Sequence, residues 1–297
     1  MNLIIALHRL SERPDYLDKQ IGNVVSIKCL EGLVNKLKDH SFVALSSFFE
    51  RRGDSNSLIS FTFDDGNSSV YELAYPFLSS RGIPFSIFVN SRNLRTGEPH
   101  WFELVEAGIM LSPLDELFYF GERFSLRARE DRLSTLRSLK RHLKKQVVLA
   151  DDLQALLVAS EVSYQSAVEW ARQRDRILTQ FEISKLSSER VEVGSHGCQH
   201  HILARLSEAE QELEIISSKR EIELITGRPC QYFSYPNGWI TDYNLTTIRL
   251  LRLGGYLGAV TARASLVEAL TTSSAGVYEM PRWCPSEKDL VAFLNSS

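Results

Sequence analysis

The sequence predicts an α/β fold, a distorted or incomplete (β/α) barrel that carries a helical insertion. Three observations support this prediction. Short apolar runs rich in β-branched and aromatic residues alternate with segments of helical periodicity. Residues 58–63, 70–80 and 84–90 form a strand–helix–strand run, which indicates a parallel sheet. Residues 103–190 are Leu-rich and helical in pattern, so we expect them to form a helical insertion within a single domain of residues 1–297.

The first predicted strand covers residues 3–7, and His8 follows at its carboxyl end. Active-site residues of barrels lie at the carboxyl ends of strands, so His8 is a candidate active-site residue, with an ordinary loop histidine as the alternative. Residues 11–23 are polar and predict a loop. Apolar residues at helical spacing predict a helix over residues 27–38.

The strand over residues 58–63 ends in two adjacent carboxylates, Asp64 and Asp65, followed by Gly66. Uncompensated carboxylates at the buried end of a strand are costly. Gly66 allows a sharp turn that could direct both carboxylates into one site. One of them could then bind a cation while the other stays free as a base. An Asp-Asp-Gly turn that caps the next helix is the alternative.

The strand over residues 191–193 leads into a pair of histidines, His196 and His200. If the chain turns helical there, both imidazoles fall on one face. Two histidines and one carboxylate suit zinc or another divalent transition metal with an open coordination position. A surface turn with two ordinary histidines is the alternative, and the Asp-Asp-Gly strand end favours the metal site. Cys198 lies between the histidines, and we expect it to be a neighbour rather than a ligand.

The remaining elements follow in the same alternation. Ser207 and Glu210 form a capping box at the start of a helix that reaches residue 226. The other elements are strands over residues 232–235, 257–261 and 277–280 and helices over residues 70–80, 245–253 and 286–294.

Composition is that of an ordinary globular protein, with 43% hydrophobic and 24% charged residues and a net charge of -3. This charge does not favour a nucleic-acid partner. No apolar run is long enough for a membrane span, and the first residues lack the basic leader of a signal peptide. Four scattered cysteines form neither a zinc-finger spacing nor a dense disulfide framework. We therefore expect a cytoplasmic protein with free thiols.

Three motifs occur in order along the chain: Thr62-Phe63-Asp64-Asp65-Gly66, His196-x-x-x-His200 and Phe233-Ser234-Tyr235-Pro236-Asn237-Gly238. With the opening Ala6-Leu7-His8-Arg9-Leu10, they resemble the motifs of polysaccharide deacetylases with the NodB-homology domain, carbohydrate esterase family 4. The resemblance covers most of the chain outside residues 103–190. It implies an incomplete β/α barrel of the NodB-homology type and a metal-dependent carbohydrate N-deacetylase.

The resemblance also implies roles for individual residues. Asp64 is then the general base, and Asp65, His196 and His200 hold the metal, with zinc expected. The backbone N–H of Asn237 helps to stabilise the oxyanion. We expect Pro236 and Trp101 to line the substrate site, Trp101 because aromatic faces suit the C–H surfaces of sugars. A plain core or loop position is the alternative for Trp101.

Two positions depart from the family pattern. Many members carry an Arg two residues before the motif proline, and this chain has Ser234 there. Arg282 is a candidate substitute that would keep Asp64 ionised, with an exposed surface Arg as the alternative. The family's Leu-His motif, which supplies the general acid, is missing, since no histidine follows His201. His8 is the leading candidate for the acid.

The expected function is removal of an N-acyl group, most simply acetyl, from an amino sugar in cell-surface glycan biosynthesis. A location in the cytoplasm favours a nucleotide- or lipid-linked sugar as the substrate. The basic run over residues 127–145 is either a solvated helix face or a patch that binds the phosphate of such a carrier. Deformylation, hydrolysis of a non-sugar amide and a non-catalytic sugar-binding module are the alternatives. The sequence leaves the oligomeric state open.

Overall fold

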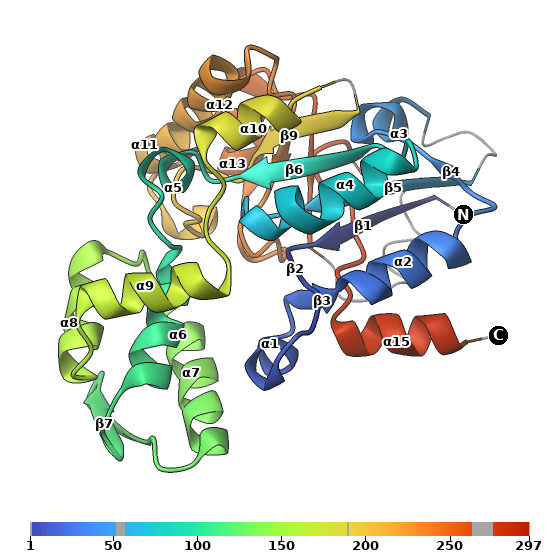
Figure 1. Ribbon diagram of the computed structural model, residues 1–297. Coiled ribbons are helices and arrows are strands. Elements are labelled where there is room, and N and C mark those ends of the chain that lie inside the picture. Colours follow the sequence, from blue (N-terminus) through green and yellow to red (C-terminus); the bar gives the residue numbers. More distant parts are fainter. Residues whose placement is uncertain (1, 52–56, 189, 263–275, 297) are drawn as a thin grey trace. The chain divides into compact units, whose positions relative to one another are not determined.

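The computed structural model describes residues 2–51, 57–188, 190–262 and 276–296 (Figure 1). The chain forms two compact units. The first combines Met1–Arg95 with Leu178–Ser297, and the second is Thr96–Ile177.

The first unit is built on a curled parallel sheet that forms a half-barrel (Figure 1). Its strands run in the order β1-β5-β6-β9-β10-β11, with β4 paired to β5. Their bounds are β1 Leu3–Leu7, β4 Ser41–Phe42, β5 Leu58–Phe63, β6 Phe85–Val89, β9 Val191–Ser195, β10 Tyr232–Ser234 and β11 Gly258–Val260. This arrangement confirms the predicted α/β fold with an incomplete barrel.

Residues 280–283 lie between the two outer strands of this sheet, and we call them the closing segment. Met280 forms a parallel bridge with Val260 of β11, and Trp283 forms one with Ile5 of β1. The predicted strand over residues 277–280 is wrong, because residues 277–279 form a turn and bend and only Met280 pairs. The backbone of the closing segment thereby connects β11 to β1.

The helices of the first unit follow the predicted pattern, with two interruptions. The helix expected over residues 70–80 is a π-turn at Val70–Ala74 followed by α4, Tyr75–Ser80. Pro76 lacks an N–H and cannot continue an α-helical ladder there, which accounts for the interruption. The helix expected from Ser207 is likewise split by a π-turn at Leu213–Ser217. Its flanking parts are α11 Glu208–Glu212 and α12 Ser218–Thr226.

The remaining described helices and strands of this unit are α1 Tyr16–Ile21, α2 Ile27–Lys36, α3 Leu45–Arg51, α5 Ser91–Thr96 (which reaches the unit boundary), α10 Gln180–Leu186, a 3-10 turn Leu203–Arg205, α13 Leu245–Leu253, α15 Glu287–Asn295, and the parallel pair β2 Arg9–Ser11 and β3 Val24–Ser26. Thus α1 lies within residues 11–23, which the sequence predicted to be a loop.

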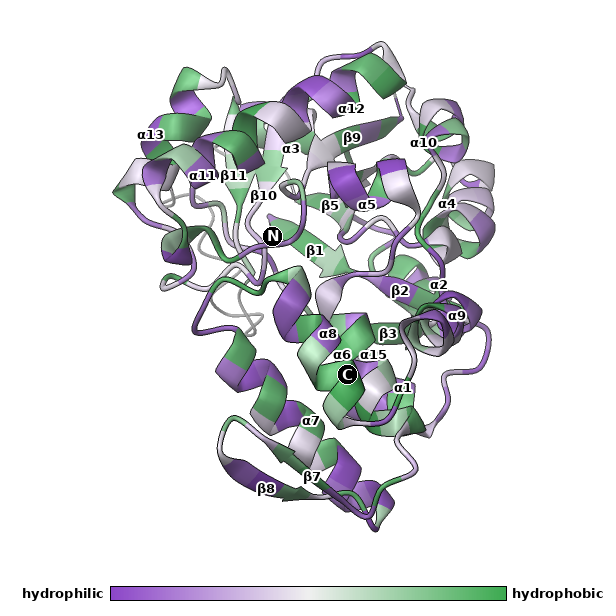
Figure 2. Ribbon diagram, turned by 90° about the vertical axis from the view of Figure 1, so that its left-hand side faces the viewer, coloured by the Kyte–Doolittle hydropathy of each residue, from purple (hydrophilic) through white to green (hydrophobic). Residues whose placement is uncertain are grey.

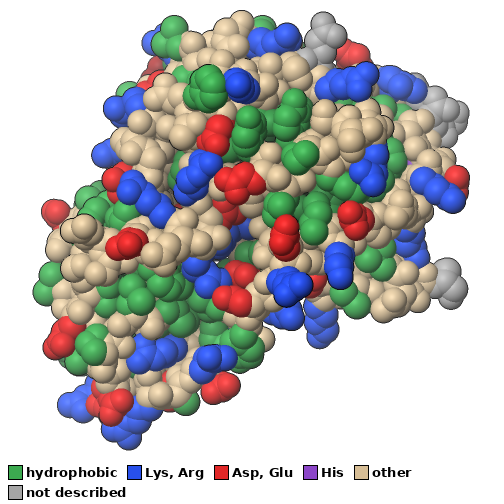
Figure 3. Space-filling view, viewed as in Figure 1, with side chains coloured by type: hydrophobic (Ala, Val, Ile, Leu, Met, Phe, Trp, Pro, Cys, Tyr) green, Lys and Arg blue, Asp and Glu red, His purple; other side chains and the backbone are tan. Residues whose placement is uncertain are grey.

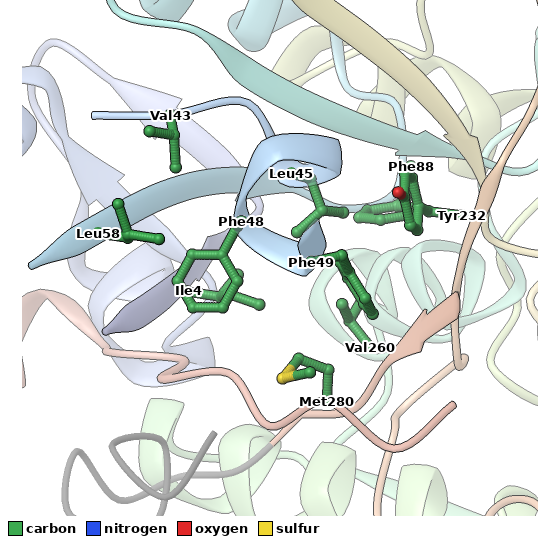
Figure 4. Packing of buried hydrophobic residues seen from close by; sticks show 10 residues of the cluster. All are labelled: Ile4, Val43, Leu45, Phe48, Phe49, Leu58, Phe88, Tyr232, Val260 and Met280. Carbon is green, nitrogen blue, oxygen red and sulfur yellow. The ribbon is translucent and has the colours of Figure 1, made fainter. Parts of the chain in front are cut away.

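A core of apolar side chains packs between α3 and the barrel strands. Figure 4 shows Phe48 and Phe49 of α3 packed between strand residues such as Ile4 and Val260. Phe49 also stacks on Tyr232, with 4.8 Å between ring centroids. Strands β1 and β11 are largely hydrophobic in Figure 2, whereas α12 and α13 carry both hydrophobic and hydrophilic residues. This packing holds α3 against the barrel strands.

The second unit packs α6, Trp101–Leu111, against α7 Arg129–Leu143, α8 Ala150–Ala159 and α9 Tyr164–Arg174. It also contains an antiparallel hairpin, β7 Glu116–Tyr119 and β8 Glu122–Ser125. The sequence predicted only helices here, so the hairpin is a correction. Its two-residue turn has Phe120 and Gly121 at positive φ, as a primed hairpin turn requires. Phe120 is a poor turn residue, which explains why the hairpin has a weak sequence signal.

The molecular surface mixes both signs of charge. On the face shown in Figure 3, Lys and Arg side chains are interspersed with Asp and Glu. Among the described residues, no helix combines the length and apolar character needed to cross a membrane.

Candidate active site

Polar side chains from distant parts of the chain meet at the carboxyl ends of the barrel strands. Asp64 and Asp65 follow β5, and His196 follows β9. The Asp64 N–H donates to the carbonyl of Leu7, and the His196 N–H donates to that of Val89. Because the strands are parallel, these ends share one edge of the sheet, where barrel enzymes place their sites.

Arg282 of the closing segment is fully buried, with 0% of its surface exposed. Its guanidinium forms two hydrogen bonds to Asp64, from Nη1 to Oδ1 at 2.8 Å and from Nη2 to Oδ2 at 2.7 Å. Its other N–H groups donate to Thr261 O, Thr62 Oγ1 and Ser234 Oγ. All five guanidinium donors are therefore used. The predicted pairing with Asp64 is present, and the alternative of an exposed surface Arg is wrong.

The charge of Arg282 controls the protonation of Asp64. Burial is the largest single influence and raises the pKa of this carboxyl, but Arg282, with smaller contributions from His196 and His8, lowers it, and together they hold the pKa well below its usual range. The pKa of Arg282 is raised although burial lowers it, because the attraction and hydrogen bonds of Asp64, with smaller effects of Cys284 and Asp65, together outweigh burial. Ser234 adds a hydrogen bond from Oγ to Asp64 Oδ2 at 3.1 Å. Asp64 is thus an ionised carboxylate held in one orientation.

Asp65, His196 and His200 form a group whose ligand atoms all lie within 4.8 Å of one another. Asp65 Oδ1 is 3.5 Å from Nε2 of each histidine. It is buried and accepts no hydrogen bond from the described residues. Two ligands of a tetrahedral zinc ion lie roughly 3.3 Å apart, so this spacing fits a divalent metal. A buried carboxylate oxygen that accepts no hydrogen bond also suits a cation as its partner.

The tautomer of His196 suits a metal ligand. Its Nδ1 is 2.7 Å from the carbonyl oxygen of Ser234, which can only accept, so Nδ1 carries the proton. Burial is the main reason why the pKa of His196 is lowered, and the ring is therefore neutral. Its Nε2 lone pair then faces Asp65. A carbonyl that fixes the ring in this way is typical of metal-bound histidines.

Three residues of the site have a backbone conformation that non-glycine residues rarely adopt. They are Asp65 (φ 72°), His200 (φ 58°) and Asn237 (φ 63°). Such residues cost free energy and gather at functional sites. The chain from His196 to His200 forms an irregular loop, so the expected helical turn is wrong. The two rings still converge, with 4.8 Å between centroids.

Asn237 begins a loop that is fixed by Asp242. The Asp242 carboxylate accepts hydrogen bonds from Asn237 Nδ2 and from the backbone N–H of Trp239. Asp242 is only 5% exposed, whereas Trp239 is 49% exposed. The loop therefore presents an accessible indole two residues after Asn237.

The other predicted site residues occupy varied positions. His8 is partly exposed between β1 and β2, and when charged it contributes to lowering the pKa of Asp64. Pro236 is buried beside the histidine loop, where its Cγ lies 3.9 Å from the position of a Cβ on Gly197. Trp101 is buried in α6 of the second unit, and its contact with substrate stays a prediction.

Sequence reasoning missed Asp242 and Glu214, which hold the loops of the site, and the exposed Trp239 near Asn237. Their signal was weak, because each stands outside the motifs or has an ordinary surface residue type. Ser234 was noticed only as the absence of an Arg. Its hydroxyl, in fact, donates to the carboxylate of Asp64.

The family model for polysaccharide deacetylases matches residues 51–112 and 164–256, just over half of the chain. The chain belongs to the polysaccharide deacetylase family. Both Asp64 and Asp65, the histidine pair and Asn237 lie in the matched residues. Membership in this family supports de-N-acetylation of a glycan by a hydrolase. Polysaccharide deacetylases of this type typically depend on a divalent metal, for which the Asp65 group is a candidate site.

Solved structures support the fold of this polysaccharide deacetylase. The deacetylase PplD of Streptococcus pyogenes has a TM-score of 0.59 at 15% identity, with 99% of this chain and 98% of that chain covered. The polysaccharide deacetylase BC0361 of Bacillus cereus has a TM-score of 0.57 at 16% identity, covering 99% and 68%. A de-N-acetylase from Aggregatibacter actinomycetemcomitans has a TM-score of 0.55 at 13% identity, covering 98% of each chain. No curated protein matches the chain in sequence.

Proposed function

We propose that this chain is a metal-dependent hydrolase that removes an N-acetyl group from an amino sugar or sugar conjugate in cell-surface glycan biosynthesis. One observation carries the proposal. A buried carboxylate, Asp64, is held ionised by Arg282 directly beside a second carboxylate that faces two histidines. A non-catalytic sugar-binding module has no use for a free base of this kind.

The residues of the site have the following roles in amide hydrolysis. Asp65, His196 and His200 would hold a divalent metal, zinc in our proposal, which when bound polarises the acyl carbonyl and activates water. Asp64 accepts a proton from the water whose oxygen attacks the acyl carbon. The Asn237 N–H donates to the oxygen that becomes negative. The C–N bond then breaks, His8 protonates the leaving amine, and acetate and a free amino sugar are the products.

The proposal is tested with amino sugars that carry different acyl groups and carriers. Purified protein is loaded with zinc and given N-acetylated and N-formylated sugars, each free, UDP-linked or in an oligosaccharide. Release of acetate that requires zinc and Asp64 supports the proposal. Absence of release from every N-acetylated substrate by a zinc-loaded, folded protein contradicts it.

The place and carrier of the reaction are part of the proposal. We propose that the enzyme works in the cytoplasm on a nucleotide- or lipid-linked sugar. The support comes from the sequence, whose four cysteines stand far apart without a disulfide framework. Cell fractionation together with the preferred substrate of the screen above tests this part. Activity only on polymeric glycan, or recovery outside the cytoplasm, contradicts it.

A further inference from the structure

One buried carboxylate outside the proposed catalytic set contacts the loop between the two histidines. Glu214 is 5% exposed. Its Oε2 accepts hydrogen bonds from the backbone N–H groups of Cys198 at 2.7 Å and Gln199 at 3.2 Å. Its Oε1 is 3.1 Å from Nδ1 of His201. A single side chain thus contacts three of the loop residues that surround His200.

The loop is shaped to fit around this carboxylate. Gly197 has a φ of +79°, and a Cβ on it would lie 2.7 Å from Glu214 Oε2. A side chain at this position would therefore push the loop away from Glu214. His200, three residues later, also has a positive φ. A non-glycine residue keeps such a conformation only where its surroundings determine it, and the hydrogen bonds of Glu214 supply that constraint.

The π-turn at Leu213–Ser217 brings Glu214 to the loop. Glu212 and Leu213, the two preceding residues, are exposed, whereas Glu214 points inward. The Cys198 Sγ lies 3.6 Å from the carbonyl oxygens of both Leu213 and Glu214. A π-turn widens the helix and alters its carbonyl pattern, and such turns often occur at functional sites. The loop therefore contacts both the side chain and the backbone of this turn.

We infer that Glu214 is a positioning residue, which fixes the loop so that His196 and His200 face Asp65 together. It acts through the backbone of Cys198 and Gln199 and through its contact with His201. This inference rests on the proposed function, because it requires that the two histidines bind a metal. Removal of a group that orients metal ligands typically lowers metal affinity about 10- to 100-fold.

Metal affinity of the purified protein tests the inference. Apo protein is titrated with Zn²⁺ in competition with a chromophoric chelator, for the native chain, Glu214→Ala, Glu214→Gln and Glu212→Gln. Glu212 is exposed on the same helical segment and serves as the matched control. We expect Glu214→Ala to bind zinc about 10- to 100-fold more weakly. Glu214→Gln should recover part of the loss, since its amide oxygen still accepts from the loop, and Glu212→Gln should bind like the native chain.

A second measurement separates positioning from a purely structural role. The absorption spectrum of bound Co²⁺ reports ligand geometry, so it should change in Glu214→Ala and Glu214→Gln at saturating cobalt. If both folded variants bind zinc as tightly as the native chain and give its cobalt spectrum, the inference is wrong. Should Glu214→Ala not fold, Glu214→Gln alone decides by the same criteria. If the native chain itself does not bind zinc, both this inference and the proposed metal site are wrong. If the native chain binds zinc and the Glu214 variants behave like it, only this inference is wrong.

Discussion

At the scale of single residues, the site depends on how each side chain uses its hydrogen-bonding groups. Arg282 uses all five N–H donors, and Asp64 accepts from Arg282 and Ser234. The oxygen of Asp65 that faces the histidines accepts none from the described residues. Two adjacent carboxylates therefore have opposite surroundings. Asp64 accepts three hydrogen bonds, which leaves one of its roughly four acceptor sites for a proton, whereas Asp65 is available to a cation.

Asp64→Asn should retain metal and lose turnover. The amide keeps the shape of the side chain but cannot accept a proton, and loss of a general base typically costs about 10²- to 10⁴-fold in rate. Turnover of the zinc-loaded variant and its zinc content are measured together. Near-native turnover would refute the role of Asp64.

Arg282→Met should lower the rate and move the acidic limb of the pH–rate profile to higher pH. The guanidinium lowers the pKa of Asp64, so its removal lets that pKa rise, and Asp64 becomes protonated at higher pH than in the native chain. The profile of kcat against pH for both proteins checks this prediction. Arg282→Lys is the companion variant, since an ammonium keeps the charge but lacks the planar pair of donors. An unchanged acidic limb in Arg282→Met would contradict the assignment.

At the scale of elements, the sequence predicted most strands but not the connections that shape the site. Strand β5 and its two aspartates were predictable because an apolar run and a charged end are both local signals. The loop from His196 to His200 was not, because its path depends on Glu214, which is distant in sequence. Likewise, the sequence predicted a strand over residues 277–280 because three of these four residues are apolar or aromatic. The bridges to β11 and β1, however, are formed by the closing segment.

The loop after β10 should bind substrate through Trp239. Its indole is half exposed, and Asp242 holds the loop next to Asn237. Trp239→Ala should raise KM for an oligosaccharide several-fold and change kcat little, because stacking on a sugar binds substrate and transition state alike. Exposed Phe181 is the matched control, as Phe181→Ala removes a surface aromatic of α10. Equal KM values for both variants and the native chain would contradict this role.

At the scale of the whole molecule, metal binding should stabilise the fold. The three proposed ligands come from β5 and from the loop after β9, so a shared ion links parts of the chain that separate on unfolding. At a zinc concentration a hundred times Kd, the expected gain is about 2.7 kcal/mol.

This stabilisation is checked by thermal unfolding with zinc and with a chelator. The native chain should unfold at higher temperature in zinc, and the His196→Ala, His200→Ala double variant should show no such difference. An equal zinc effect on both proteins, or equal zinc content by elemental analysis, would exclude these ligands.

Because Arg282 lies in the closing segment, the site can be completed only late in the synthesis of the chain. Asp64 and Arg282 are separated by 218 positions. At translation rates of 5–20 residues per second, Arg282 emerges on the order of 10 to 40 s after Asp64. Until then, a nascent barrel that buries β5 would bury the Asp64 carboxylate without its counter-ion. Protonation of Asp64, or a sheet that stays open at that edge, is the expected state of the unfinished protein. The nascent chain therefore gains a base that is both buried and ionised only when the closing segment has been synthesised.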